Sequence, residues 1–426
     1  MGLALLLGSF ALCVAIGVPV AFALGVAALA TFAYEGLPLL VELRRIVSGI
    51  SVFSLLAIPF FIFAGELMLH GGIASRLVRL ASAAVGSVRG GLGQVNVFSS
   101  MLFGGISGSA VADVSALGSI LIPVMKEKGY DPDYAVNVTV TSSIAGILIP
   151  PSHNMILFAI AAGGGISVSQ LFLAGVVPGI LMCLCLAVAA YLVAVRRGYA
   201  AERFPGVNAL LIALVVAFPG LLTAVIIVGG VLSGYFTVTE SGAIGVIWAV
   251  LVTILAYRSL SWQGFLLSVR RAVRTTSIVM ILVGCASAFA YMLAFYRVPA
   301  ELTALLTGLS SEPIVILLLL NAVLLVLGMI MDMAALILIC TPIFLPVAVE
   351  TGMHPIQFGM LLMMNLGLGL CTPPVGACLF VGCAVGGVRI ESVLRTIWPF
   401  YLAILVALML ITFVPAISMT LPNWLG

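Results

Sequence analysis

Eleven long apolar segments, separated by short stretches that hold nearly all of the charged residues, constrain the fold of this chain more than any other feature. Only 7% of its 426 residues are charged (17 Lys and Arg, 14 Asp and Glu), whereas soluble proteins carry roughly 25%. Because about 20 apolar residues cross a bilayer as one helix, we predict a polytopic membrane protein embedded in lipid. The segments run roughly over 3–33, 51–69, 93–125, 134–163, 172–195, 207–232, 240–257, 275–296, 313–348, 355–387 and 396–420.

The same composition excludes several functions. A net charge of +3 provides no basic surface for nucleic acid. The eight cysteines lie in apolar stretches without a CxxC pair, so neither a disulfide framework nor a zinc site is expected. The first ten residues lack the basic region of a signal peptide and continue as an apolar run, so 3–33 is predicted to be a retained first helix.

Two apolar segments, 93–125 and 313–348, are too long for one span. Their centres, 104–109 and 328–333, are rich in glycine, and glycine clusters interrupt helices. Each segment is therefore either one kinked span or a re-entrant hairpin of two half-helices.

Two other segments carry a proline pair in mid-span. These pairs are Pro150-Pro151 within 134–163 and Pro373-Pro374 within 355–387. A proline pair removes two backbone donors, so we expect a broken helix at each.

A repeat relates these interruptions. Sliding the chain against itself by 223 residues without a gap pairs Gly105 with Gly328, Gly146 with Gly369, and one proline pair with the other. Between 105 and 151, 11 of 47 positions are identical, mainly Gly and Pro rather than the Leu matches that chance would favour. We infer two homologous repeats.

Basic residues predict how the repeats are oriented. With the linker 196–206 in the cytoplasm and both long segments counted as hairpins, 14 of the 17 basic residues fall in cytoplasmic loops, and only Arg44, Arg45 and Arg297 fall outside. Equivalent loops then lie on opposite faces, so the repeats are predicted to be inverted, with a cytoplasmic N-terminus and a periplasmic C-terminus. Since every basic residue lies in or next to a loop, no Lys or Arg is expected near the hairpin tips.

The expected fold class is an all-α polytopic membrane protein with two inverted-topology repeats, each holding a re-entrant hairpin and a proline-broken helix. This architecture is typical of secondary transporters, because backbone groups freed by a broken helix are tolerated in hydrocarbon only where they line a site. The expected divisions are first-repeat scaffold helices with an interfacial arm (1–92), the first transport element (93–163), scaffold helices with the cytoplasmic linker (164–312), the second transport element (313–387) and a C-terminal scaffold helix (388–426).

Several ordered motifs also resemble those of one family. They are Gly105-Ile-Ser-Gly-Ser-Ala-Val-Ala-Asp113, Ile122-Pro123, Gly129-Tyr130-Asp131, Ile149-Pro-Pro-Ser152, Phe236-Thr-Val-Thr-Glu-Ser-Gly-Ala243, Gly328-Met-Ile-Met-Asp-Met333 and Cys371-Thr-Pro-Pro-Val-Gly376. Together they resemble the large membrane subunit of TRAP transporters, the DctM-like family within the ion transporter superfamily, over nearly the whole chain.

The resemblance implies an elevator-type importer in the bacterial inner membrane, driven by Na⁺ as coupling ion and without another cofactor. Its substrate would be a small organic acid anion, of dicarboxylate or sugar-acid type. Its partners would be a small four-helix membrane subunit and a periplasmic substrate-binding protein, both separate chains. Two departures from the family pattern, Val238 in place of Pro and the polar Ser152-His153-Asn154 after the proline pair, leave the acid open.

In such a fold each hairpin tip faces a helix break, which gives one cation site per repeat. The tip serines, and the carboxylate of Asp332, have an alternative role as caps of the following half-helix, and Asp113 as a charge that balances its tip. His153 is as well explained by a structural hydrogen bond. The candidates are Ser107, Gly108, Ser109, Gly146, Pro150 and Pro151 for Na⁺ site 1; Asp332, Met331, Gly369, Thr372, Pro373 and Gly376 for Na⁺ site 2; and Ser109, Asp113, Ser152, His153, Asn154, Pro374 and Val375 for substrate.

Two other functions compete with this one. Asp113 and Asp332 would suit an intramembrane aspartyl protease if they shared a proton, but the repeat pairs Asp332 with Ser109 and Asp113 with Leu336, and no enzyme is predicted. The second alternative is a proton-coupled secondary transporter of the wider superfamily that works without a binding protein. Outside the tips, Glu66 is a candidate partner for Arg76 or Arg79.

Overall fold

The structure is a computed structural model that describes residues 1–309 and 312–425, and within this part of the chain it consists of helices and connections without strands. The helices are α1 (Gly2–Ala15), α2 (Val20–Tyr34), α3 (Leu39–Ile50), α4 (Ala57–His70), α5 (Ile73–Val85), α6 (Gly91–Ser107), α7 (Ala110–Glu127), α8 (Pro132–Ser142), α9 (Ala145–Leu148), α10 (His153–Ala161), α11 (Val168–Arg196), α12 (Val207–Leu232), α13 (Val238–Leu251), α14 (Trp262–Phe295), α15 (Val298–Leu309), α16 (Pro313–Ile330), α17 (Met333–Glu350), α18 (Pro355–Leu370), α19 (Ala377–Gly386), α20 (Ile390–Leu394), α21 (Trp398–Phe413) and α22 (Pro415–Leu425).

The described helices include seven that are long and apolar enough to cross a membrane, and up to nine spans if each of two bent helix pairs counts as one. One bent pair, Pro132–Leu148 with His153–Ala161, is the predicted broken helix of the first repeat, and it turns by 54°. The chain is therefore a multi-pass helical membrane protein, as its composition predicts.

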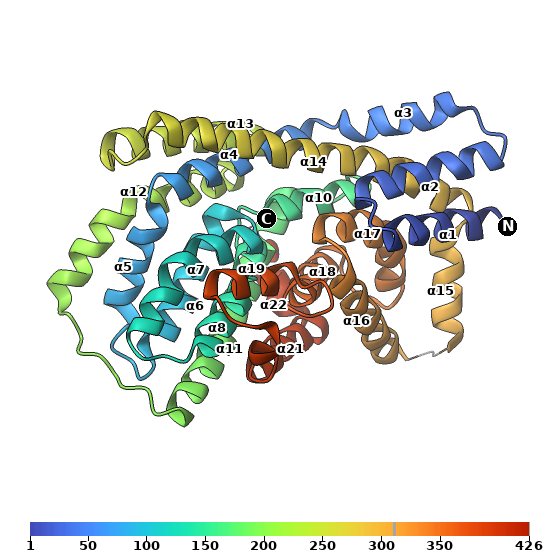
Figure 1. The fold of residues 1–426 in the computed structure, drawn as a ribbon. Coiled ribbons are helices and arrows are strands. Elements are labelled where there is room, and N and C mark those ends of the chain that lie inside the picture. The colour runs from blue at the N-terminus through green and yellow to red at the C-terminus, as the bar shows by residue number, and fades with distance from the viewer. Residues whose placement is uncertain (310–311, 426) are drawn as a thin grey trace.

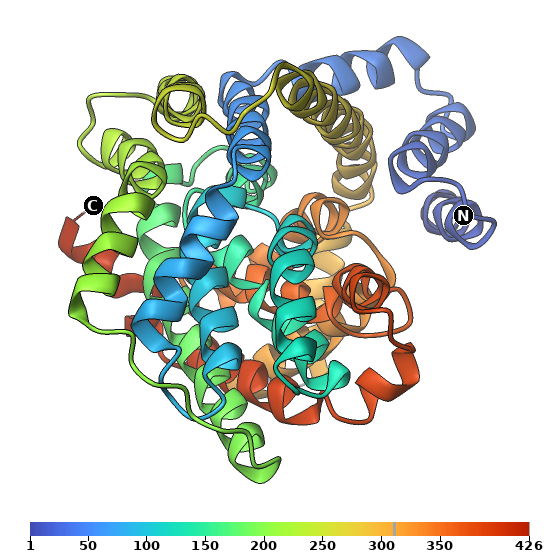
Figure 2. The same cartoon turned by 60° about the vertical axis from the view of Figure 1, so that its left-hand side comes forward.

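The prediction of one helix over 3–33 is wrong. The chain breaks between α1 and α2, where Gly17 adopts the left-handed conformation (φ 85°) and Pro19 lacks an N–H to continue the hydrogen-bond ladder. The two short helices pack against each other at the periphery of the molecule (Figure 2). The predicted single C-terminal helix is likewise divided, because α21 and α22 meet at a bend of 59° before Pro415.

The two glycine-rich segments are broken where the sequence predicts. Helix α6 ends at Ser107 and α7 begins at Ala110, while α16 ends at Ile330 and α17 begins at Met333. The helix boundaries also follow the repeat: adding 223 to the bounds of α7 (110 and 127) gives those of α17 (333 and 350). Both breaks within the proline-broken helices contain a cis Pro-Pro bond.

The helices form two groups. The peripheral group comprises α1–α5 and α12–α15, with α14 packed on α2, α3 and α4, and α13 packed on α4. The central group comprises α6–α11 and α16–α22, with α11 packed on α6, α18 and α21. Figure 1 shows α3, α13 and α14 along one edge and the central group beneath them. Helix α11 therefore lies with the hairpins and broken helices rather than with α12–α14.

Elements of the two repeats interlock in the central group. Helix α19 of the second repeat packs on α7 and α8 of the first. The contact is close because Gly382 and Gly386 face Val140 and Val136, and a Cβ on either glycine would lie 2.3 or 2.4 Å from a valine methyl group. The central group is thus one packed body built from both halves of the sequence.

Two connections join the groups near one end of this body. The first is the short stretch 86–90 between α5 and α6, where a Cβ on Gly90 would lie 2.2 Å from that of Ala194. The second follows α11, where Arg197 donates hydrogen bonds to both carboxylate oxygens of Asp133 at 2.9 and 2.7 Å. Thr396 donates to the same carboxylate at 2.7 Å. This cluster ties the start of α8 to the end of α11 and to the loop before α21.

Candidate functional site

The tip of the first hairpin is a two-residue turn. Gly108 has a left-handed backbone (φ 60°), which a residue with a side chain rarely adopts. Ser109 is the N-cap of α7, and its hydroxyl accepts a hydrogen bond from the amide of Ala112 at 3.5 Å. The capping role considered for Ser109 is thus present, and its main-chain carbonyl accepts the first hydrogen bond of α7 from the amide of Asp113 at 3.0 Å, which leaves one lone pair for other groups.

The first helix break lies directly against this tip. A Cβ on Gly146 would lie 3.2 Å from Oγ of Ser107 and 3.4 Å from the carbonyl oxygen of Ser109. A Cβ on Gly108 would lie 3.3 Å from the carbonyl oxygen of Pro151, and one on Gly105 would lie 3.1 Å from that of Pro150. The structure therefore brings together all six residues of candidate Na⁺ site 1 (Ser107, Gly108, Ser109, Gly146, Pro150 and Pro151) around hydroxyl and carbonyl oxygens.

The second tip is built differently. Asp332 takes the place of Ser109 as the N-cap of α17, accepting a hydrogen bond from the amide of Ala334 at 3.0 Å. Its carboxylate is exposed, beside Met331, and its hydrogen bond stays within its own helix. This acidic residue at a hairpin tip is therefore accessible to a ligand, whereas Asp113 is buried.

The second break contacts the end of α16 rather than the carboxylate of Asp332. The amide of Val375 donates to the carbonyl of Met329 at 3.0 Å, and Gly369 packs on Gly328 so closely that a Cβ would lie 2.5 Å from its carbonyl carbon. Thr372 donates its hydroxyl to the carbonyl of Leu368 at 2.7 Å, so only its oxygen lone pairs are free to bind a cation. In candidate Na⁺ site 2 the hairpin therefore lies against the break, but the candidate residues come from two places. Thr372, Pro373 and Gly376 lie at the break, whereas Asp332 and Met331 lie at the tip.

The proposed substrate residues divide into two sets. Asp113 and Ser152 are buried, and their side-chain oxygens have no hydrogen-bond partner among the described residues. Asn154 donates to the carbonyl of Gly108 at 3.5 Å, which holds the start of α10 against the tip. His153 faces a cavity, while Pro374 and Val375 belong to the second break.

That cavity, of about 350 Å³, lies between the first hairpin tip and the peripheral group. Its walls come from α4, α6, α7, α10 and α14, and its polar lining residues are Glu66, Ser107, Ser109, Ser115, His153, Arg271 and Thr275. The expectation that no Lys or Arg lies near a hairpin tip is therefore wrong. Arg271, which charge counting puts in a cytoplasmic loop, lies within α14, a helix that continues for 34 residues through that region.

Sequence reasoning also missed the part that Glu66 plays in this cavity. Glu66 does not pair with Arg76 or Arg79: it lies 3.7 Å from Nδ1 of His70, and its Oε2 is buried without a hydrogen-bond partner among the described residues. Arg76 instead stacks on the ring of Tyr257. An acidic residue inside an apolar span is the one signal that marks Glu66 in the sequence.

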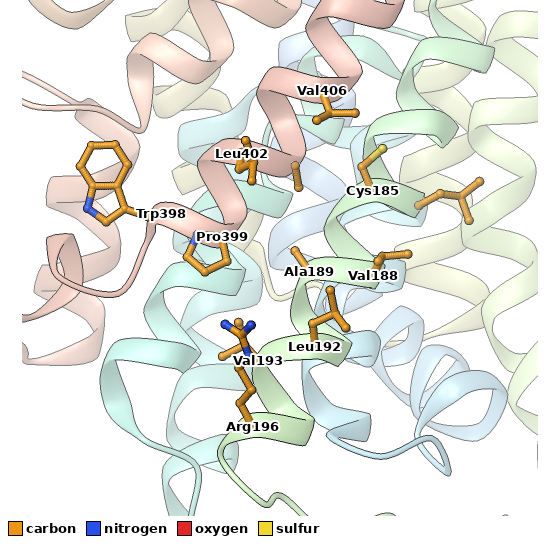
Figure 3. A pocket seen from close by; sticks show the side chains of 12 residues that line it. Cys185, Val188, Ala189, Leu192, Val193, Arg196, Trp398, Pro399, Leu402 and Val406 are labelled. Carbon is orange, nitrogen blue, oxygen red and sulfur yellow. The ribbon is translucent and has the colours of Figure 1, made fainter.

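A larger hollow, of about 650 Å³, lies elsewhere, between α11 and α21 (Figure 3). Leu192, Val188 and Leu402 are among its apolar walls, and Arg196 and Trp398 lie toward one end. Its one ionisable side chain besides a cysteine is Arg196. Such a groove suits lipid chains rather than a charged solute, so the cavity at the hairpin tip is the better candidate site.

A helical membrane protein whose interrupted helices meet in pairs is built like a secondary transporter. The fold agrees: the solved Alcanivorax borkumensis YdaH transporter matches it with a TM-score of 0.65 at 14% identity, covering 89% of this chain and 87% of the other.

The chain belongs to the family described as "Tripartite ATP-independent periplasmic transporter, DctM component", whose sequence profile matches residues 7–417. The resemblance found in the motifs is thereby confirmed, and the family is one of transport permeases. The chain is 41% identical to the uncharacterized protein YgiK of Salmonella typhimurium over 421 residues (98% of this chain, 96% of the relative).

Several relatives have named substrates. The chain is 40% identical to the C4-dicarboxylate TRAP transporter large permease protein DctM of Pseudomonas aeruginosa (88% of this chain, 87% of the relative). It is 36% identical to the sialic acid TRAP transporter large permease protein SiaM of Vibrio cholerae (89% and 88%).

Proposed function

We propose that this chain is the large permease of a sodium-coupled, binding-protein-dependent importer for a small organic acid anion. The observation that carries the proposal is the contact between the first tip and the first break. There Oγ of Ser107 and the carbonyl of Ser109 lie against Gly146, and the carbonyls of Pro150 and Pro151 lie against Gly105 and Gly108. Hard cations prefer oxygen ligands of this kind. The named substrates of the relatives, a C4-dicarboxylate and sialic acid, support an organic acid as cargo.

The helix ends at the same place suit an anion. The N-termini of α7 and α10 both point at the site, and each half-helix carries about half a positive charge at its N-terminus. A bound cation adds a full charge. Anion and Na⁺ then stabilise each other, and by linkage the effect is equal in both directions.

The transport step follows from the two packed groups of helices. The central group, with both hairpins and both broken helices, moves against the peripheral group as an elevator. Because α11 and α21 pack on the broken helices, we assign them to the moving body, whereas the division made from sequence counts them as scaffold within 164–312 and 388–426.

The transporter sits in the bacterial inner membrane with its C-terminus in the periplasm, and it works with a small four-helix membrane subunit and a periplasmic binding protein. The charge count supports a cytoplasmic N-terminus. Helices α1 and α2 have 14 and 15 residues, and each is shorter than the about 20 residues of a full crossing.

The decisive experiment is uptake by vesicles that contain the chain with both partner proteins, over a panel of organic acids. We expect accumulation of one class of acid with an inward Na⁺ gradient and at least tenfold less in sodium-free buffer. Equal uptake driven by a proton gradient without Na⁺ would reject the sodium-coupled mechanism.

A proton-coupled transporter without a binding protein is the second candidate. The observation in its favour is Asp113, a buried carboxyl group without a hydrogen-bond partner among the described residues, which a proton would neutralise. This mechanism predicts that Asp113→Asn abolishes uptake and that the chain transports without a binding protein. The sodium mechanism predicts that Asp113→Asn retains Na⁺-driven uptake.

A further inference from the structure

We propose that Arg271 and Glu66 form a subsite for the substrate beside the first hairpin tip, in which Arg271 binds the carboxylate of a hydroxylated monocarboxylic acid. The inference rests on the proposed function, since it supplies the contacts that would recognise the anion. It concerns the cavity of about 350 Å³ between α4, α14 and the tip. That volume lies within the range of small-molecule binding pockets.

Arg271 is available for a ligand. Its guanidinium makes no ion pair or hydrogen bond with any residue that the structure describes. Its two basic neighbours on the same helix, Arg270 and Arg274, do not line the cavity. Across the cavity lie Ser107 and Ser109. A planar guanidinium with an unoccupied donor pair matches a carboxylate in two-point geometry, which a lysine would not provide.

Glu66 determines which group the cavity favours on the part of the ligand away from the carboxylate. Its Oε2 is buried in the cavity wall, 3.7 Å from Nδ1 of His70 and without a hydrogen-bond partner among the described residues, and it forms no ion pair with Arg271 within 4 Å. A hydroxyl group on the substrate would donate to this oxygen. A second carboxylate at the same place would meet a like charge, so the subsite favours a sugar acid over a dicarboxylate.

The subsite has no counterpart in the second repeat. Subtracting 223 from 271 gives Ser48, and adding 223 to 66 gives Phe289, so neither charge recurs. Arg271 and Glu66 belong to the peripheral group, whereas Ser107 and Ser109 belong to the central group. The substrate carboxylate therefore meets Arg271 only when the first tip lies against α4 and α14. The subsite is thus complete in only one of the two end states of the transport cycle.

The test compares Arg271→Gln and Glu66→Gln with a matched control, Arg274→Gln, which removes a neighbouring charge of the same helix outside the cavity. Binding of D-galacturonate and succinate to each purified protein in nanodiscs is measured by calorimetry, and Na⁺-driven uptake is measured with both partner proteins present. Thermal unfolding checks that each variant is folded.

We expect wild-type protein and Arg274→Gln to bind galacturonate within twofold of each other and more tightly than succinate. Arg271→Gln should lose at least tenfold in galacturonate affinity with an unchanged melting temperature, and Arg271→Lys should restore little of it. Glu66→Gln should raise succinate affinity relative to galacturonate at least fivefold.

Galacturonate binding by Arg271→Gln equal to that of Arg274→Gln would overturn the subsite, as would wild-type protein that fails to bind galacturonate. An unchanged preference in Glu66→Gln would overturn the assignment of Glu66. If binding depends on Arg271 while wild-type vesicles take up no acid with a Na⁺ gradient, the proposed sodium-coupled function fails and the subsite stands. If uptake is Na⁺-driven and Arg271→Gln behaves as the control, only the subsite fails.

Discussion

The close contact between Gly328 and Gly369 allows a quantitative prediction of what happens when the second hairpin is forced away from its broken helix. In Gly369→Ala the new Cβ would lie 2.5 Å from the carbonyl carbon of Gly328, a backbone atom that cannot rotate away. Ordinary contact begins near 3.4 Å, so α16 and α18 must separate by about 0.9 Å. The hydrogen bond from Val375 to Met329, now 3.0 Å, would then lengthen to about 4 Å and be lost.

The expected loss of stability follows from these changes. Overpacking of a filled interface costs roughly 1–3 kcal/mol, and a lost hydrogen bond costs about 1 kcal/mol. Replacing a helical glycine by alanine returns roughly 0.5–1 kcal/mol. The net destabilisation should be roughly 1–3 kcal/mol, and because the break moves away from the tip, the half-saturating Na⁺ concentration should rise severalfold.

The control is Gly229→Ala, the same change inside α12, where a Cβ meets nothing within 4 Å. It should keep full transport and melt at the wild-type temperature or slightly above it. Both variants are compared by thermal unfolding in nanodiscs and by Na⁺-dependent uptake with both partner proteins. If Gly369→Ala matches Gly229→Ala in melting temperature and in Na⁺ response, the tight contact does not control the site.

Three further predictions concern topology, cation binding and rigidity. A cysteine at Gly165 should react with a membrane-impermeant reagent only from the periplasm and one at Arg203 only from the cytoplasm, because α11 crosses between them; labelling of both from one side would contradict the inverted repeats. Asp332→Asn and Ser109→Ala should raise the half-saturating Na⁺ concentration without lowering the melting temperature by more than a few degrees, whereas unchanged Na⁺ dependence in both would remove these residues from the cation sites. Arg197→Gln, which removes the ion-pair partner of the half-buried Asp133 carboxylate but leaves the hydrogen bond from Thr396, should cost roughly 1.5–3 kcal/mol of stability, and an unchanged melting temperature would show that the cluster is dispensable.

The breaks were predictable from sequence because glycine and proline act locally. Gly108, Pro150 and Pro373 determine where a helix stops whatever packs around it. The recurrence of the proline pair at a spacing of 223 residues separates it from chance, whereas Met331 stands at the position that matches Gly108. Gly17 and Pro19 divide the first segment by the same local effect, but no repeat match marks them, since Glu240 and Gly242 stand at the equivalent positions.

The composition of the candidate site was less predictable, because it depends on which helices pack on the tip. Arg271 is one of three arginines in a stretch that charge counting assigns to a loop, and its place in the cavity follows from the unbroken helix α14. Glu66 lies 205 residues away in sequence (271 − 66), so only the packing of α4 on α14 brings the two together. No pattern in the sequence predicts that two residues so far apart line the same cavity.

The short connection between α5 and α6 limits the distance of any elevator stroke. Fully extended, the five residues 86–90 reach at most roughly 18 Å. Gly90 is also wedged against α11, so part of that reach is already used by the fold. If the first hairpin slides farther than this past a stationary scaffold, α5 must unwind or travel with it. If α5 keeps its helix in such a displacement, it travels with the first hairpin, and the charges of Arg76 and Arg79 change their depth in the membrane with it.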